Sequence, residues 1–236
     1  MSEFFLNWFA QLEKTFIVNG GYKMIIQGLG NTALITVFAL IIGVAVGSIL
    51  AISKYFEKEG IVYKILAVIS DIYVTVIRGI PVVVLLLIFY FIILKSSSGL
   101  IVAIVCFGIN SGAYVAEVIR SGLNAVDNGQ LEAARSLGMN KMQAMYKIIF
   151  PQAIRYIIPA IFNEFIALVK ETSVAGYVAI MDLTRAGNLI RNSTFDAINT
   201  LVLVALIYLG IVVLLTQLMK LIERKLNKNV KRPGHN

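Results

Sequence analysis

The side chains best able to do chemistry are a carboxylate and an amide inside an apolar stretch, residues 153–175. Glu164 lies 13 residues beyond Pro151, which is roughly 20 Å along a helix and therefore near the middle of a bilayer. Ionisable groups at that depth are costly and mark pathways or binding sites for polar solutes. Asn163 precedes Lys170 by seven residues, so the two share a helix face. We expect Asn163, Glu164 and Lys170 to bind a solute noncovalently, and no catalytic residue is expected.

A purely structural role is the alternative for these groups. Glu164 lies seven residues before Glu171 on the same helix face, and Lys170 or Arg191 could neutralise either carboxylate in a buried pair. Pro159 would bend this helix just before the polar group and free a backbone carbonyl for a ligand.

Three further residues are weaker candidates for contact with a solute, and they are Glu117, Tyr114 and Asp196. Glu117 follows Ser111 and Tyr114 at three-residue steps, which places all three on one polar stripe. Arg120 comes three residues later, so a structural Glu117–Arg120 contact is the favoured interpretation. Asp196 opens the last apolar stretch, where an aspartate is a good helix N-cap, and capping is slightly favoured over a solute role.

A polar segment at residues 132–151 is the candidate docking element. It starts with helix-forming residues, breaks at Gly138, resumes over 141–150 and reaches Pro151, which predicts two short helices joined by a glycine turn and ended by the proline. A DNA-binding helix-turn-helix has a similar pattern, but apolar runs of membrane length bracket this segment. The candidate docking residues are Glu132, Ala133, Ala134, Gly138 and Pro151.

The composition is that of an integral membrane protein. Hydrophobic residues make up 58% of the chain and the mean hydropathy is +0.84, whereas soluble domains average about 45–50% apolar residues. We predict an all-α polytopic protein with five spans at about 24–53, 79–95, 99–123, 153–175 and 197–222. Residues 60–77 are read as an amphipathic lead-in to the second span, broken near Pro81, with a separate sixth span as the alternative.

Three regions follow from this division of the chain. Residues 1–23 form an interfacial N-terminal segment, 24–223 the transmembrane domain with its docking loop at about 125–151, and 224–236 a basic cytoplasmic tail. We expect no cleavable signal peptide here, because the segment carries charges and lacks an apolar core. The aromatic residues that suit a membrane interface are Phe4, Phe5, Trp8, Phe9 and Phe16.

The net charge of +8 indicates orientation, because the basic residues are divided among loops instead of forming one basic domain. With the N-terminus outside, 15 of the 21 basic residues lie in the loop after the first span, the docking loop and the tail. The positive-inside rule therefore places the docking loop and the C-terminus in the cytoplasm. Nucleic-acid binding is not expected.

Several chemistries lack the residues they need. The lone cysteine, Cys106, lies in an apolar run and the lone histidine, His235, is in the polar tail, so no metal site is expected. No phosphate-binding loop occurs, and the chain should not hydrolyse ATP. A G-x-x-x-G motif, Gly43 to Gly47, permits close helix packing either within the subunit or between subunits.

The docking segment resembles the cytoplasmic coupling loop of ABC-type importer permeases, with Ile148 and Pro151 in register and Phe150 where that family usually has Leu. Residues 77–81 (IRGIP), 111–117 (SGAYVAE) and 163–173 (NEFIALVKETS) resemble the polar amino acid uptake branch, and the resemblance covers residues 22–223. It implies two permease subunits, a homodimer here, two ATP-binding cassette subunits that bind ATP and Mg²⁺, and an extracytoplasmic amino acid-binding protein. The resemblance implies no cofactor in this chain itself, and membrane lipid is the remaining expected partner.

The expected function is alternating-access transport of a polar amino acid. An excess of acids near the candidate site favours a cationic substrate such as arginine, lysine or histidine, and glutamine is the alternative. An ion-coupled secondary transporter is less favoured, since no internal repeat is visible. A non-transporting scaffold or receptor would not need several acids at mid-depth.

Overall fold

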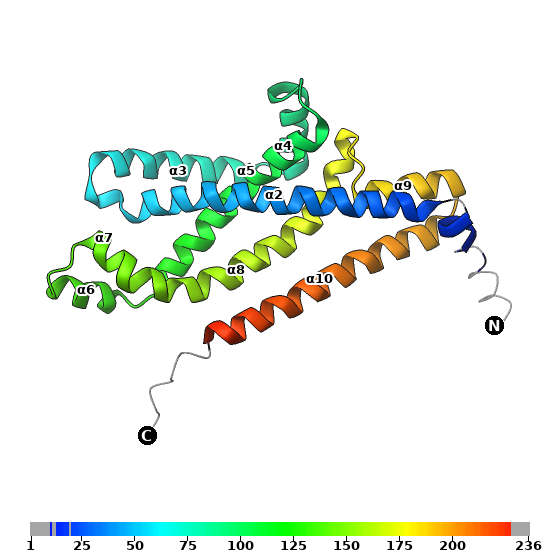
Figure 1. Ribbon diagram of the computed structural model, residues 1–236. Coiled ribbons are helices and arrows are strands. Elements are labelled where there is room, and N and C mark those ends of the chain that lie inside the picture. Colours follow the sequence, from blue (N-terminus) through cyan, green and yellow to red (C-terminus); the bar gives the residue numbers. More distant parts are fainter. Residues whose placement is uncertain (1–9, 11–12, 19, 228–236) are drawn as a thin grey trace. The chain divides into compact units, whose positions relative to one another are not determined.

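The computed structural model describes residues 10, 13–18 and 20–227, and all regular elements in that part are helical (Figure 1). Four stretches are long and apolar enough to cross a membrane: α2 (Gly21–Tyr55), α5 (Gly99–Asn124), the run Lys141–Val178 and α10 (Ala197–Asn227). A fifth candidate is a broken pair, α3 (Ile61–Gly79) followed by α4 (Val82–Ile88) and η3 (Phe89–Ile93). These findings confirm the predicted all-α fold, and the described residues contain four or five candidate spans.

Proline creates the break between α3 and α4. Pro81 precedes the first residue of α4, with φ −56° and ψ 133°, and α3 ends at Gly79. The extended ψ is what a residue outside the helix requires, and the proline ring also disfavours helical backbone at Ile80. Residues 61–79 form the first half of the broken pair, and the predicted break at Pro81 is present.

The chain forms two compact units, each built from separate segments. The first contains residues 1–39, 80–108 and 167–213, and the second contains residues 40–79, 109–166 and 214–236. Helices α2, α5, α8 (Phe150–Glu171) and α10 each contribute to both.

In the first unit, the start of α2 packs against the segment around α9 (Leu183–Thr194). Asn31 donates a hydrogen bond to the carbonyl of Met181 (2.9 Å), and the Leu183 amide donates to the Thr32 hydroxyl (3.2 Å). Gly28 permits this approach, because a Cβ there would lie 2.7 Å from the Asp182 carbonyl oxygen. The core beside these contacts contains Phe16, Ile25, Leu183, Ala186, Ile190 and Val204.

In the second unit, α3 runs back alongside the second half of α2 (Figure 1), and Lys54 binds Asp71 at 2.7 Å. The other face of this part of α2 packs on α5. A Cβ at Gly43 would lie 2.7 Å from the Ser111 hydroxyl oxygen, and one at Gly47 would lie 2.7 Å from Val115. The G-x-x-x-G motif therefore provides close helix packing within the chain.

The boundaries differ from the prediction at the two ends. Helix α2 begins at Gly21, and a short π-helical turn, η1 (Lys14–Val18), precedes it. Phe16 is wrong as an interfacial residue, because its ring is buried in the core of the first unit. The other four aromatic residues and His235 lie outside the described residues. Helix α10 extends to Asn227, so the predicted tail begins as helix.

Candidate functional site

The docking loop begins with α6 (Asn128–Ser136), which carries the three residues at the start of the segment. Asp127 caps this helix by accepting a hydrogen bond from the Gly129 amide (2.7 Å). At its other end the Gly138 amide donates to the Arg135 carbonyl (2.9 Å) and the Met139 amide donates to the Ala134 carbonyl (3.1 Å). This pair of bonds is a Schellman motif, and it requires the positive φ of 81° at Gly138.

The second part of the loop is α7 (Lys141–Ala144), which a capping box initiates. The Asn140 side chain accepts from the Gln143 amide, and the Gln143 side chain accepts from the Asn140 amide. Helix α7 then continues through a π-helical turn, η4 (Met145–Ile149), directly into α8. The predicted two helices and glycine turn are confirmed.

The prediction that the helix stops at Pro151 is wrong. Pro151 is the second residue of α8, and the helical run from Lys141 continues to Val178. A proline in a helix interior loses one hydrogen bond and crowds the carbonyl four residues earlier. Here the preceding turn is π-helical, with the Phe150 amide bonded to the Met145 carbonyl, so the ladder is already widened where the ring enters.

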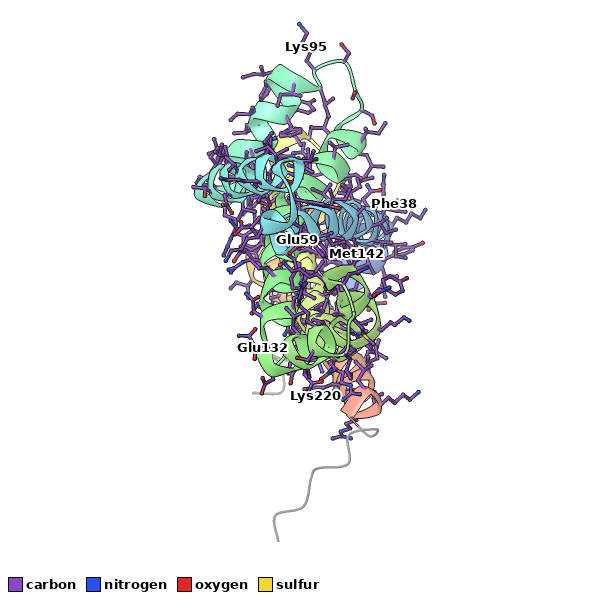
Figure 2. All side chains as sticks on the ribbon, turned by 90° about the vertical axis from the view of Figure 1, so that its left-hand side faces the viewer. Phe38, Glu59, Lys95, Glu132, Met142 and Lys220 are labelled. Atoms are coloured by element: carbon purple, nitrogen blue, oxygen red, sulfur yellow. The ribbon has the colours of Figure 1, made fainter. Side chains whose placement is uncertain are left out.

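The docking loop has a buried side and an exposed side. Ala134 and Ala144 are buried, whereas Glu132 and Ala133 are exposed. Figure 2 labels Glu132 on α6. Sequence reasoning missed three exposed apolar side chains beside them. These are Leu137, which is 79% exposed, Tyr146, which is 77% exposed, and Met142. The sequence feature that could have indicated Met142 and Tyr146 is their spacing of four residues, which places both on one helix face.

One lysine fixes the loop to the turn between α2 and α3. Lys141 pairs with Glu59 (3.2 Å) and donates to the carbonyl of Tyr55 (3.1 Å). Its ammonium also lies 5.1 Å from the centre of the Tyr55 ring and 5.5 Å from that of Phe56, which is cation–π distance. The sequence marked Lys141 only as a charge that sets orientation.

The carboxylate predicted to lie at mid-membrane has a hydroxyl partner in the second unit. Ser111 on α5 donates a hydrogen bond to Glu164 on α8 (3.0 Å), and the side chain of Glu164 is only partly exposed. Asn163 beside it is exposed. The predicted stripe on α5 and the predicted carboxylate on α8 thus meet at Ser111.

The rest of that stripe forms a charge cluster in the same unit. Arg120 contacts both carboxylate oxygens of Glu117, at 2.6 and 3.1 Å, and Arg78 reaches it at 4.0 Å. The Arg78 guanidinium lies 4.9 Å from the centre of the Tyr114 ring. The favoured Glu117–Arg120 contact is confirmed, and Arg78 is an additional member.

The remaining candidates belong to the first unit. Asp196 is buried and caps α10, because it accepts from the Asn199 amide (3.1 Å) and from the Asn199 side chain (2.8 Å). The favoured capping role is confirmed. Lys170 is exposed near the end of α8.

A second capping aspartate in that unit was missed. Asp182 is fully buried between the spans and accepts from the Thr184 and Arg185 amides at the start of α9. Burial raises the pKa of its carboxyl group, and the backbone hydrogen bonds oppose that rise. Among the described residues, no group of three or more histidines, cysteines or carboxylates could hold a metal ion.

Comparison with known proteins identifies the kind of protein that has this arrangement. The family described as "Binding-protein-dependent transport system inner membrane component" matches residues 43–228. The arginine transport system permease protein ArtQ of Bacillus subtilis (strain 168) is 36% identical over 209 residues, which cover 87% of this chain and 93% of that protein. The putative glutamine transport system permease protein GlnP of Rickettsia prowazekii (strain Madrid E) is also 36% identical over 209 residues, covering 87% and 94%.

Two solved structures have a fold similar to that of this chain. A chain from a crystal structure of an amino acid ABC transporter with histidines superposes with a TM-score of 0.81 at 36% identity, covering 89% of this chain and 98% of that one. A chain of the inward-facing MetNI methionine ABC transporter shares the fold, with a TM-score of 0.76 at 23% identity over 87% of this chain and 97% of that one.

The chain therefore belongs to the family of binding-protein-dependent transport system inner membrane components, the multi-pass permease subunits of ABC importers, in which a separate subunit hydrolyses ATP.

Proposed function

We propose that this permease carries cationic amino acids into the cell by alternating access. The chemistry of the substrate supports this: an amino acid offers an ammonium group that needs an acceptor, and a cationic one offers a second positive charge. Glu164, held by Ser111 at 3.0 Å, is the acceptor in the second unit that carries the proposal. Asn163, which is exposed beside Glu164 in the same unit, supplies a donor for the substrate carboxylate.

The relatives support an amino acid but differ on which one. One relative at 36% identity is named for arginine, and the matched crystal structure is described with histidines. Glutamine is the second candidate, because a permease named for glutamine is equally identical.

The partners and orientation belong to the same proposal. Two copies of this chain would pair, two ATPase subunits with ATP and Mg²⁺ would bind the docking loops, and an extracytoplasmic binding protein would deliver the amino acid. The N-terminus would lie outside and the C-terminus in the cytoplasm, because most basic residues then face inward. The exposed side of α6 and α7, with Glu132, Ala133 and Gly138, is the surface offered to the ATPase.

The test is ATPase stimulation and uptake by the complex reconstituted with its binding protein. Arginine, lysine and histidine should stimulate both, and glutamine and glutamate should not. Glu164→Gln should reduce transport at least about tenfold through loss of a charge-assisted contact. Glu223→Gln, the same change at an exposed residue of α10, is the matched control. Stimulation by glutamine alone would establish the second candidate. Full transport of arginine by Glu164→Gln would show that Glu164 is not the acceptor.

A further inference from the structure

Two hollows flank the turn that joins α2 to α3 in the second unit. One has a volume of about 570 Å³ and is lined by residues that include Lys54, Lys58 and Lys64. The other has a volume of about 400 Å³ and shares Lys54 and Lys58 with the first. Both lie where two helices of the membrane domain end, at Tyr55 and before Ile61.

Most cations around these hollows already have acidic partners. Lys54 binds Asp71 at 2.7 Å and Glu57 at 3.0 Å, and Lys141 binds Glu59. Lys58 and Lys64 are different: both are exposed, and neither forms a salt bridge with any residue that the structure describes. The first hollow thus offers two ammonium groups to an anion from outside the chain.

The larger hollow is continuous with an apolar stripe on α3. Ile61 and Val68 line the hollow, and Ile65 and Ile72 lie on the same helix face at steps of four residues from them. All four side chains are more than half exposed. An exposed apolar stripe on a helix at membrane depth faces acyl chains.

We propose that this hollow binds the phosphate headgroup of an anionic phospholipid, with Lys58 and Lys64 on the phosphate and an acyl chain along the stripe from Ile61 to Ile72. Charge complementarity and position select this occupant. The two lysines lie at the end of the spanning segment, at headgroup level, where basic residues attract anionic lipid. A soluble anion would use the same ammonium groups but would leave the stripe uncovered.

The experiment compares lipid retention by the full permease–ATPase complex in nanodiscs. Lys58→Gln/Lys64→Gln is compared with the parent and with Lys95→Gln/Lys220→Gln, two exposed lysines that do not line either hollow. Discs contain phosphatidylglycerol diluted in phosphatidylcholine, and lipid retained after detergent extraction is counted by mass spectrometry. The parent and the control pair should retain phosphatidylglycerol, and Lys58→Gln/Lys64→Gln should retain it about tenfold less. Val68→Ser should also reduce retention, by removing part of the acyl contact.

Further arms distinguish the other occupants. Inorganic phosphate at millimolar concentration should leave retention of phosphatidylglycerol unchanged, and displacement by phosphate would show a site for a free anion instead. Equal retention by Lys58→Gln/Lys64→Gln and the parent, or equal loss in the control pair, would overturn the proposal. Loss of the ATPase from Lys58→Gln/Lys64→Gln with unchanged lipid retention would assign the surface to the ATPase. The result does not depend on which amino acid the permease carries.

Discussion

Replacement of Gly43 by alanine should disturb the candidate carboxylate through one intermediate residue. The added Cβ would lie 2.7 Å from the Ser111 hydroxyl oxygen and 2.9 Å from its Cβ, whereas carbon atoms in contact are about 3.5–4.0 Å apart. Either α2 and α5 separate by on the order of 1 Å, or Ser111 turns away. In both cases the Ser111–Glu164 bond is weakened. Overpacking of this kind costs about 1–3 kcal/mol.

Alanine variants of two other glycines on α2 distinguish an effect on helix packing from an effect on transport. In Gly47→Ala the Cβ would lie 2.7 Å from Val115 and 2.8 Å from the Ala116 amide nitrogen, so it overpacks the same helix pair without touching Ser111. In Gly30→Ala nothing lies within 4 Å of the new atom. Gly43→Ala and Gly47→Ala should each lower the Tm in detergent by roughly 2–10 °C, and Gly30→Ala should not.

Transport per folded complex is the deciding measurement. Gly43→Ala should reduce arginine uptake about tenfold, in proportion to the loss of a hydrogen bond to a charged acceptor, while Gly47→Ala should remain near the parent. The pair Gly43→Ala/Ser111→Gly exchanges the two volumes, so it should regain most of the stability but not the uptake. Full uptake in Gly43→Ala, or recovery of uptake in the exchanged pair, would refute the link from Gly43 through Ser111 to Glu164.

Three further predictions follow from other contacts. In the Gly138→Val variant the complex should hydrolyse ATP with little transport, because a φ of 81° strains a β-branched residue by about 1–3 kcal/mol. The Gly138→Asn variant should transport normally. Normal uptake by the valine variant would contradict this prediction. Lys141→Met should cost about 1 kcal/mol of stability and so lower the Tm by only a few degrees. It should nevertheless release the docking loop from Glu59, which would be measured as faster hydrogen exchange over residues 132–146. Unchanged exchange would argue against anchoring by Lys141. Because the pKa of Asp182 is raised in the folded protein, ionisation of its carboxyl group lowers the stability of the fold above that pKa. This loss of stability should disappear as the pH falls from the raised pKa toward the ordinary value of 3.8. Asp182→Asn should flatten this part of the pH–Tm profile, and an unchanged profile would contradict it.

Local signals predicted the elements that local chemistry creates. The break at Pro81 and the turn at Gly138 both follow from backbone restrictions of single residues, and both occur where the sequence indicated. The cap at Asp196 and the Glu117–Arg120 contact involve neighbours three residues apart. Such features need no knowledge of the rest of the fold.

Features that depend on distant residues were missed or misplaced. Lys141 and Glu59 are 82 residues apart in the sequence, and no pattern in either segment indicates their pairing. Phe16 is an aromatic residue of the kind that is common at membrane interfaces, but it is buried in a core that also contains Ile25 and Ile190. The stop predicted at Pro151 is wrong because the rule for prolines assumes a regular α-helix, and the π-helical turn before Pro151 lifts that restriction.

The uninterrupted helix from Lys141 through Pro151 to Glu164 fixes an angular relation as well as a length. Each residue turns an α-helix by about 100° and advances it by about 1.5 Å. A single-residue insertion or deletion between residues 152 and 162 would therefore point Glu164 away from Ser111 while the docking loop stayed in place. Seven residues make nearly two turns, leaving a phase error of roughly 20°. Insertions or deletions of seven residues in this segment should therefore be tolerated far better than those of one or two. The number of residues between the docking loop and Glu164 thus determines the direction in which the carboxylate points.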